Sequence, residues 1–216
     1  MSLSYLESVK KMPLFALPVR STVVPLAKGR VLISPGSRLT PAELASAGAI
    51  TDIVAPSLLH TAGMAGAAKA FPNARLWGPR GVREKHPELR WAGILGEDAW
   101  PHEAELAALP VLGVERMREF VFLDKATRSL VVTDLAFNLR DARGLGARII
   151  LGLFGTYQRF AISKLFLKFA NDKDALRASL AKICAQDFDT VVPSHGQVEQ
   201  GGKAALSAAA RERGLA

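Results

Sequence analysis

The runs of sequence that decide the fold read Val131-Val132-Thr133-Asp134-Leu135-Ala136-Phe137 and Val191-Val192-Pro193-Ser194-His195-Gly196. Each is an apolar strand that stops at one polar side chain able to bind a metal, Asp134 in the first and His195 in the second. Loops at strand ends hold side chains on a rigid scaffold, and α/β proteins build their sites there. Asp134 and His195 are therefore the first candidate catalytic residues.

Length and composition set limits on this interpretation. The chain has 216 residues, of which 49% are hydrophobic and 22% charged, as in ordinary globular proteins. One domain over residues 1–216 accounts for that length. The net charge is +8, but the basic residues are scattered and not interleaved with aromatic ones, so we expect no specific nucleic-acid partner.

Cysteine content and the N-terminus bear on location. Cys184 is the single cysteine, which excludes an internal disulfide and a cysteine-rich zinc site. The apolar run of residues 12–19 is interrupted by Pro13 and Pro18 and has no small-residue cleavage site after it. We interpret that run as an extended entry segment and expect a cytoplasmic protein.

Strand and helix patterns alternate along the chain. Apolar runs predict strands at residues 22–26, 30–34, 52–55, 75–79, 120–123 and 129–133. Thr40, followed by Pro41 and Glu43, is typical of a capped helix start, and residues 61–70 form an alanine-rich helical pattern. Opening hairpins followed by strand–helix alternation predict a layered α/β architecture.

The segment from about residue 144 to 170 differs from the rest. Residues 149–154 are continuously apolar, and Ile162, Leu165, Phe166 and Phe169 recur at helical spacing among lysines. Core packing with solvated lysines is the simpler interpretation. The alternative is a basic amphipathic helix with weak contact to a membrane surface, or one that lines a hydrophobic groove.

Of the four histidines, two follow buried strands. His86 lies in a polar stretch and His102 at a plausible helix start, and neither stands out as a site residue. His60 follows the strand at residues 52–55 across a short link, and His195 follows another. Together with Asp134, these two histidines indicate a shared site at the strand ends.

The order of elements and these strand-end residues resemble the metallo-β-lactamase superfamily over about residues 21–200. The resemblance implies a four-layer αββα sandwich with its site at one sheet edge. Asp134 matches the strand-end aspartate of the family, with Thr133 in place of glycine. His195 matches the final histidine of the family, with Ser194 in place of glycine.

Other family positions differ. Residues 53–63 occupy the place of the histidine-rich loop, with His60 alone where the family has three histidines and an aspartate. The lone histidine of the family falls near residues 113–117, where Glu115 is the candidate replacement and Glu119 is another. The ligand set is then His60, Asp134, His195 and Glu115, too few for two metals but enough for a single divalent Zn, Fe or Mn.

Three hypotheses follow. The first is a degenerate, hydrolase-like member of the superfamily, a pseudoenzyme with lost or altered activity and no bound metal. The second is a non-catalytic binding or scaffold module with residues 144–170 as a hydrophobic lid or a surface for a homo-oligomer. The third is a mononuclear metal-dependent hydrolase acting on an unknown small molecule.

Overall fold

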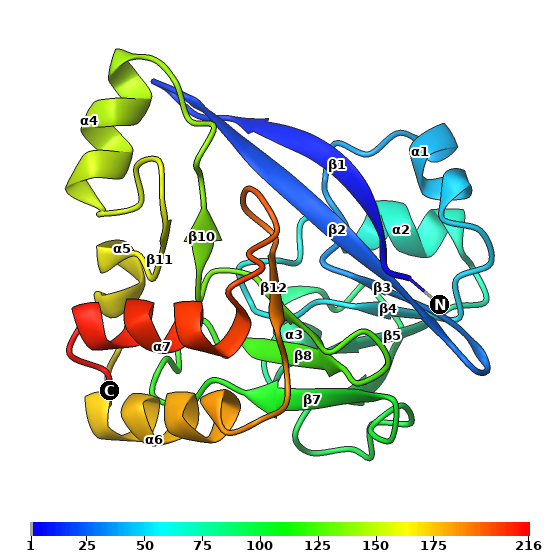
Figure 1. Ribbon diagram of the computed structural model, residues 1–216. Coiled ribbons are helices and arrows are strands. Elements are labelled where there is room, and N and C mark those ends of the chain that lie inside the picture. The colour runs from blue at the N-terminus through cyan, green and yellow to red at the C-terminus, as the bar shows by residue number, and fades with distance from the viewer. Residues whose placement is uncertain (1) are drawn as a thin grey trace.

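A computed structural model describes residues 2–216 of the chain. Two sheets lie face to face, and helices cover the outer face of each (Figure 1). The larger sheet has six strands in chain order: β1 (Ser4–Lys11), β2 (Ala16–Leu26), β3 (Gly29–Ile33), β4 (Asp52–Val54), β5 (Arg75–Gly78) and β6 (Trp91–Ile94). The smaller sheet has four strands, in the order β12 (Thr190–Pro193), β9 (Ser129–Val132), β8 (Phe120–Asp124) and β7 (Leu106–Pro110).

Helices pack on both sides of this pair of sheets. Those that follow the strands of the larger sheet are α1 (Pro41–Ser46), α2 (Met64–Ala70) and α3 (Val82–Lys85), and those that pack on the smaller sheet are α6 (Lys173–Cys184) and α7 (Gly202–Glu212). The core accordingly lies in three layers. Val24, Ile33 and Val54 of the larger sheet meet Phe122 and Val192 of the smaller one in the middle layer. The αββα sandwich that the sequence predicted is confirmed.

Local sequence signals start several of these elements where we expected. The Thr40 hydroxyl accepts the Glu43 amide while the Glu43 carboxylate accepts the Thr40 amide, which completes the predicted capping box of α1. The Asp172 side chain accepts the amides of Asp174 and Ala175 and so begins α6. Cys184 is the last residue of α6, as its helical pattern indicated.

The N-terminal entry segment is extended, but it forms a long hairpin that the sequence did not predict. β1 and β2 pair antiparallel from Ser4↔Val23 to Lys11↔Ala16, and the hairpin crosses the molecule diagonally in Figure 1. Pro18 fits inside β2 because its part of the strand pairs only with β1, which leaves its carbonyl free for another contact.

The predicted helix around residues 162–169 is much shorter than its pattern. Residues 144–170 contain α4 (Leu145–Leu153), β11 (Phe160–Ala161) and α5, which covers only Lys164–Leu167; β11 pairs with β10 (Phe137–Asn138), just before the segment. Ser163 caps α5 by accepting the Leu165 amide, so Ile162 precedes the helix. Within residues 2–216 the structure contains no helix that is both long and apolar enough to cross a membrane.

Candidate metal site

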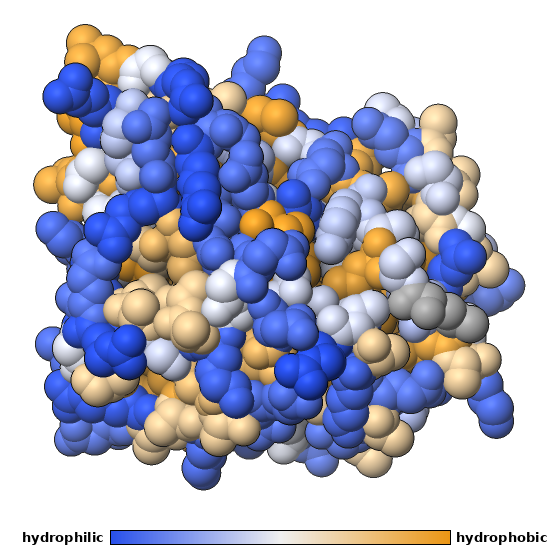
Figure 2. Space-filling model, viewed as in Figure 1, coloured by the Kyte–Doolittle hydropathy of each residue, from blue (hydrophilic) through white to orange (hydrophobic). Residues whose placement is uncertain are grey.

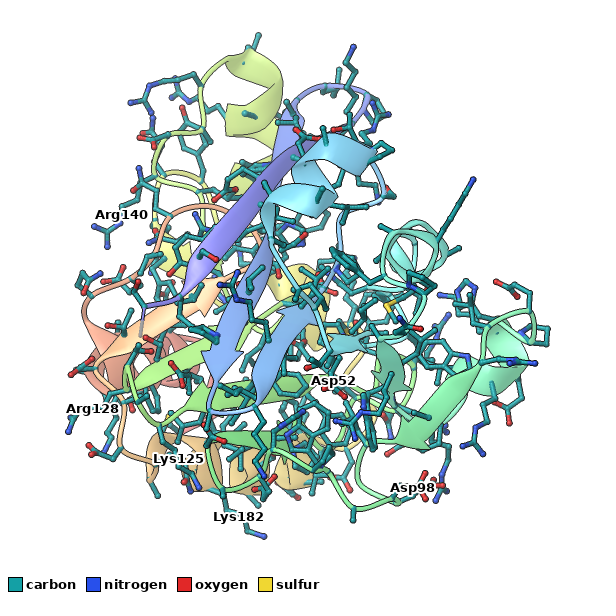
Figure 3. All side chains as sticks on the ribbon, turned by 90° about the vertical axis from the view of Figure 1, so that its right-hand side faces the viewer. Asp52, Asp98, Lys125, Arg128, Arg140 and Lys182 are labelled. Atoms are coloured by element: carbon teal, nitrogen blue, oxygen red, sulfur yellow. The ribbon has the colours of Figure 1, made fainter. Side chains whose placement is uncertain are left out.

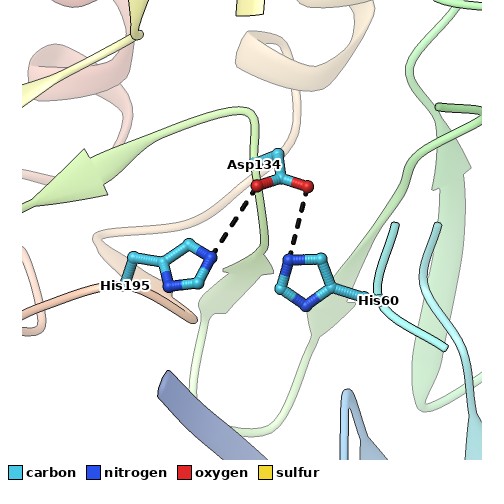
Figure 4. Close-up of side chains that lie close together, drawn as sticks. All are labelled: His60, Asp134 and His195. Atoms are coloured by element: carbon cyan, nitrogen blue, oxygen red, sulfur yellow. Dashed lines mark ion pairs between the residues drawn. The ribbon is translucent and has the colours of Figure 1, made fainter. Parts of the chain in front are cut away.

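Three strand ends bring His60, Asp134 and His195 together (Figure 4). β9 and β12 are parallel neighbours, with Val132 opposite Pro193, so the residues just after them must lie side by side. Asp134 and His195 follow these strands. His60 arrives from the other sheet, in the turn after β4.

Backbone hydrogen bonds lock the loop that carries His60. The His60 amide donates to Ser57 O at 3.2 Å, and the Leu58 amide donates to Met117 O at 2.8 Å. The Phe120 amide donates to Pro56 O at 2.8 Å. The turn after β4 is thereby fastened to the start of β8, which joins the two sheets at the site.

Both histidine rings point their Nε2 atoms at the Asp134 carboxylate. His60 Nε2 lies 3.3 Å from Asp134 Oδ2, and His195 Nε2 lies 3.7 Å from Asp134 Oδ1. One ligand atom from each of the three residues can be chosen so that all lie within 4.8 Å of one another. The three side chains are largely buried, with 11%, 18% and 6% of the His60, Asp134 and His195 side chains exposed.

The far nitrogen of each ring is held in place. His195 Nδ1 lies 2.9 Å from Pro18 O, and Nδ1 must be the donor because a carbonyl oxygen can only accept. The neutral ring therefore presents the lone pair of Nε2 to the site. His60 Nδ1 lies 2.7 Å from Ser34 Oγ. Ser34 itself has a left-handed backbone, with φ 57°, at the end of β3. Phe137 stacks on the His195 ring at 5.0 Å.

Glu119 fastens the Asp134 loop from beneath. This fully buried carboxylate accepts the amides of Thr133 and Leu135 and the Thr133 hydroxyl, all on Oε1. Burial and the neighbouring Asp134 charge raise the pKa of Glu119 to about 7, although these hydrogen bonds act in the opposite direction. Glu119 Oε2 is buried without a hydrogen-bond partner among residues 2–216.

The charges within the site depend on one another. Burial alone would raise the pKa of Asp134, but His60 and His195 hold that pKa well below its usual range. Burial alone would lower the pKa of His60, yet the Asp134 carboxylate outweighs burial and raises it. The site therefore has a strongly ionised carboxylate between two imidazoles.

Glu115, the fourth ligand proposed from the sequence, lies apart from this cluster. Its side chain is 62% exposed and its Oε2 lies 3.4 Å from Arg118 Nε. Among residues 2–216, His60, Asp134 and His195 are the one group of histidine, cysteine and acidic side chains close enough to share a metal. Glu119, the other candidate named from the sequence, lies beneath the Asp134 loop and outside this group.

The distances between the histidine nitrogens and the Asp134 oxygens are longer than in a directly hydrogen-bonded histidine–aspartate pair. His102 Nε2 and Asp52 Oδ2, a directly bonded pair elsewhere in the molecule, lie 2.9 Å apart. The corresponding separations at the site are 3.3 and 3.7 Å, and Asp134 Oδ2 is buried without a hydrogen-bond partner among the described residues. Two ligand atoms on one tetrahedral metal, with bonds of about 2.0–2.2 Å, lie about 3.4 Å apart.

A cavity of about 470 Å³ opens onto these three residues. We call it the triad pocket. Its walls come from the β1–β2 hairpin, the loop after β3, α4, α5 and Phe137. The volume falls within the range of about 300–1,000 Å³ typical of small-molecule sites. Neither the hairpin wall nor the role of Glu119 could be found from local sequence patterns.

Gly196 allows His195 to lie where it does. Its φ is +103°, and a Cβ there would come within 1.9 Å of Asn138 O. We expect Gly196→Ala to lower the free energy of unfolding by about 1–3 kcal/mol, since both backbone strain and a clash result. Urea denaturation measures this loss.

Gly152→Ala provides the matched control for Gly196→Ala. Gly152 lies inside α4, and a Cβ there would meet nothing within 4 Å. Alanine at that position should raise stability by about 0.5–1 kcal/mol through helix propensity. Equal stability of the two variants would contradict the account of Gly196.

Solved structures resemble this fold. The metallo-beta-lactamase from Pontibacter korlensis matches with a TM-score of 0.66 at 16% identity, over 96% of this chain and 93% of that chain. The FIM-1 metallo-beta-lactamase from Pseudomonas aeruginosa, in its mono-zinc form, matches with a TM-score of 0.65 at 13% identity, over 100% of this chain and 97% of that chain. The Flv1 flavodiiron core from Synechocystis matches with a TM-score of 0.65 at 12% identity, over 97% of this chain and 57% of that chain.

These likenesses show that the chain has the metallo-β-lactamase fold, as the strand-end residues implied. The sequence itself matches no protein-family model and no curated protein. Identities of 12–16% agree with a divergent sequence on this fold.

Proposed function

We propose that the protein is a mononuclear metal-dependent hydrolase that holds one divalent Zn, Fe or Mn ion through His60, Asp134 and His195. Residues 1–216 would then form one domain, with a hydrophobic and basic helical insert at about residues 144–170. The observation that carries it is the convergence of the three side chains, with their ligand atoms within 4.8 Å of one another. Two imidazoles and a carboxylate are an accepted set for zinc or non-haem iron. They are too few for the two-metal centre of the wider fold family.

The chain's own residues prepare this site for such an ion. Pro18 O fixes the His195 tautomer, Ser34 orients His60, and Glu119 holds the loop of Asp134. A divalent metal held by these residues would supply a Lewis acid and would lower the pKa of water at the site. In hydrolysis, the water oxygen bonds to the electrophilic atom of the substrate. The bond to the leaving group breaks, and the leaving atom keeps the electron pair and takes up a proton.

Metal titration of the chelator-treated protein tests this proposal. We expect binding of about one equivalent and, at free metal about 100-fold above Kd, a stabilisation of about 2.7 kcal/mol. For a chain of this size that raises Tm by about 5–10 °C. Less than about a tenth of an equivalent, with no rise in Tm, would contradict the proposal and favour the metal-free pseudoenzyme.

A second candidate role is favoured by the outward face of α4. Leu145, Ile149 and Leu153 are 73%, 56% and 67% exposed, and Arg148 lies among them. Figure 2 shows apolar residues at the upper edge of the molecule, where Figure 1 places α4. An exposed apolar helix face with basic neighbours suits weak docking on an anionic membrane surface. Flotation with anionic vesicles distinguishes docking from an inert surface.

A further inference from the structure

We propose that the triad pocket binds an amphipathic anion, with an aliphatic chain against the wall between the β1–β2 hairpin and α4 and an anionic head group beside Lys10 and Arg38. The inference shares its site with the proposed function and names the class of ligand that the site would take. It depends on the pocket walls and rim rather than on the metal itself.

The wall of the pocket is a packed apolar surface. Phe15 and Leu17 from the hairpin, together with Phe137, pack against the buried Leu151 of α4. Phe154, just after α4, extends the same lining. A surface built from two elements that converge over a cavity offers an aliphatic chain contact on more than one side.

The rim of the pocket is positively charged. Lys10 and Arg38 are exposed and line it, and neither takes part in an ion pair among residues 2–216. Asp134 is the one carboxylate among the described residues that line the pocket. An anionic head group would therefore meet two free cations.

A neighbouring cavity of about 450 Å³ shows the contrast. It shares Phe15 and Leu151 with the triad pocket, but its lining holds two carboxylates, and its two arginines already have hydrogen-bond partners. Arg20 Nε lies 2.8 Å from Glu7 Oε1, and the Arg143 guanidinium donates to the carbonyls of Arg140 and Ala142. Asp141 adds a second carboxylate to that lining. The triad pocket differs from this neighbour in having one carboxylate and two basic side chains without an ion-pair partner among residues 2–216.

Calorimetric titration with decanoate, decyl phosphate and decanol tests the inference on metal-free and metal-loaded protein. We expect both anions to bind at least about tenfold more tightly than decanol. The double variant Lys10→Glu/Arg38→Glu should remove that advantage and leave decanol binding unchanged. Phe154→Ser should weaken all three ligands. Lys182→Glu, at an exposed position of α6, is the control and should change none of the three affinities.

The outcomes separate this inference from the proposed function. Decanol binding as tight as that of the anions, or full affinity in the double variant, would overturn it. Decanoate binding that requires metal and ignores Lys10 and Arg38 would also overturn it, because the carboxylate would then be a metal ligand. Metal loading without anion binding refutes only the inference. Anion binding by a protein that takes up no metal refutes only the proposed function.

Discussion

Asp134→Asn should abolish metal binding. The substitution keeps the shape of the side chain but removes the one anionic ligand of the cluster, which leaves two neutral imidazoles. Loss of an outer-shell partner alone costs about 10–100-fold in metal affinity, so loss of the carboxylate should cost more than about 100-fold. Bound metal should fall from about one equivalent to below about a tenth, measured by elemental analysis of purified protein.

Glu115→Gln is the matched control for Asp134→Asn. It makes the same change from carboxylate to amide at a side chain that is 62% exposed and outside the cluster. Metal content should stay at about one equivalent. His195→Ala should behave like Asp134→Asn. A variant at Asp134 that keeps its metal, or loss of metal in Glu115→Gln, would refute the three-ligand assignment.

Asp52→Ala should have the largest effect on stability. Asp52 has no exposed surface, and it accepts two hydrogen bonds from Arg75, one from Trp77 Nε1 and one from His102 Nε2. Figure 3 shows it within the molecule, whereas Lys125, Arg128 and Lys182 lie at the periphery. Removing one partner from a buried charged network costs about 3–5 kcal/mol. Urea denaturation at neutral pH measures this loss.

Asp187→Ala is the control for Asp52→Ala. Asp187 is 76% exposed and lies 2.8 Å from Arg128, which is itself half exposed. A surface pair of this kind is worth about 0–1 kcal/mol. Similar losses in the two variants would contradict the burial argument for Asp52.

Acid should reduce the difference in the free energy of unfolding between the wild type and Asp52→Ala. Burial opposes ionisation of Asp52, but its hydrogen bonds from His102, Arg75 and Trp77 outweigh burial and hold its pKa well below the usual range. A carboxyl with a lowered folded pKa contributes stability above the unfolded pKa of about 3.9 and loses it progressively as pH falls below that value. The measurement is the same pair of denaturation curves repeated at acidic pH.

The sequence could predict the strand-end residues because their positions follow from topology. Asp134 and His195 end two apolar runs, and parallel neighbours bring such ends together. The capping box at Thr40 was likewise visible, because its partners are three residues apart.

Contacts over long separations could not be found in this way. The sequence predicts a helix start at His102, but the structure has a turn there, in which His102 binds Asp52, 50 residues earlier. Glu119 reaches the loop of Asp134 from another strand. The hairpin wall was missed because Pro13 and Pro18 argue against a strand when only local propensity is considered. Its docking depends on Arg20, whose amide donates to Ser194 O at 2.7 Å.

The hydrogen bond from His195 to Pro18 joins positions 177 residues apart. A contact between such distant positions closes a long loop, at an entropic cost that local contacts do not carry. The first strands and the last strand must both be folded before His195 has its tautomer and its place beside Asp134. Under the proposed function, uptake of metal therefore marks the completion of folding, and a nascent chain that still lacks its last strand has nowhere to hold the ion.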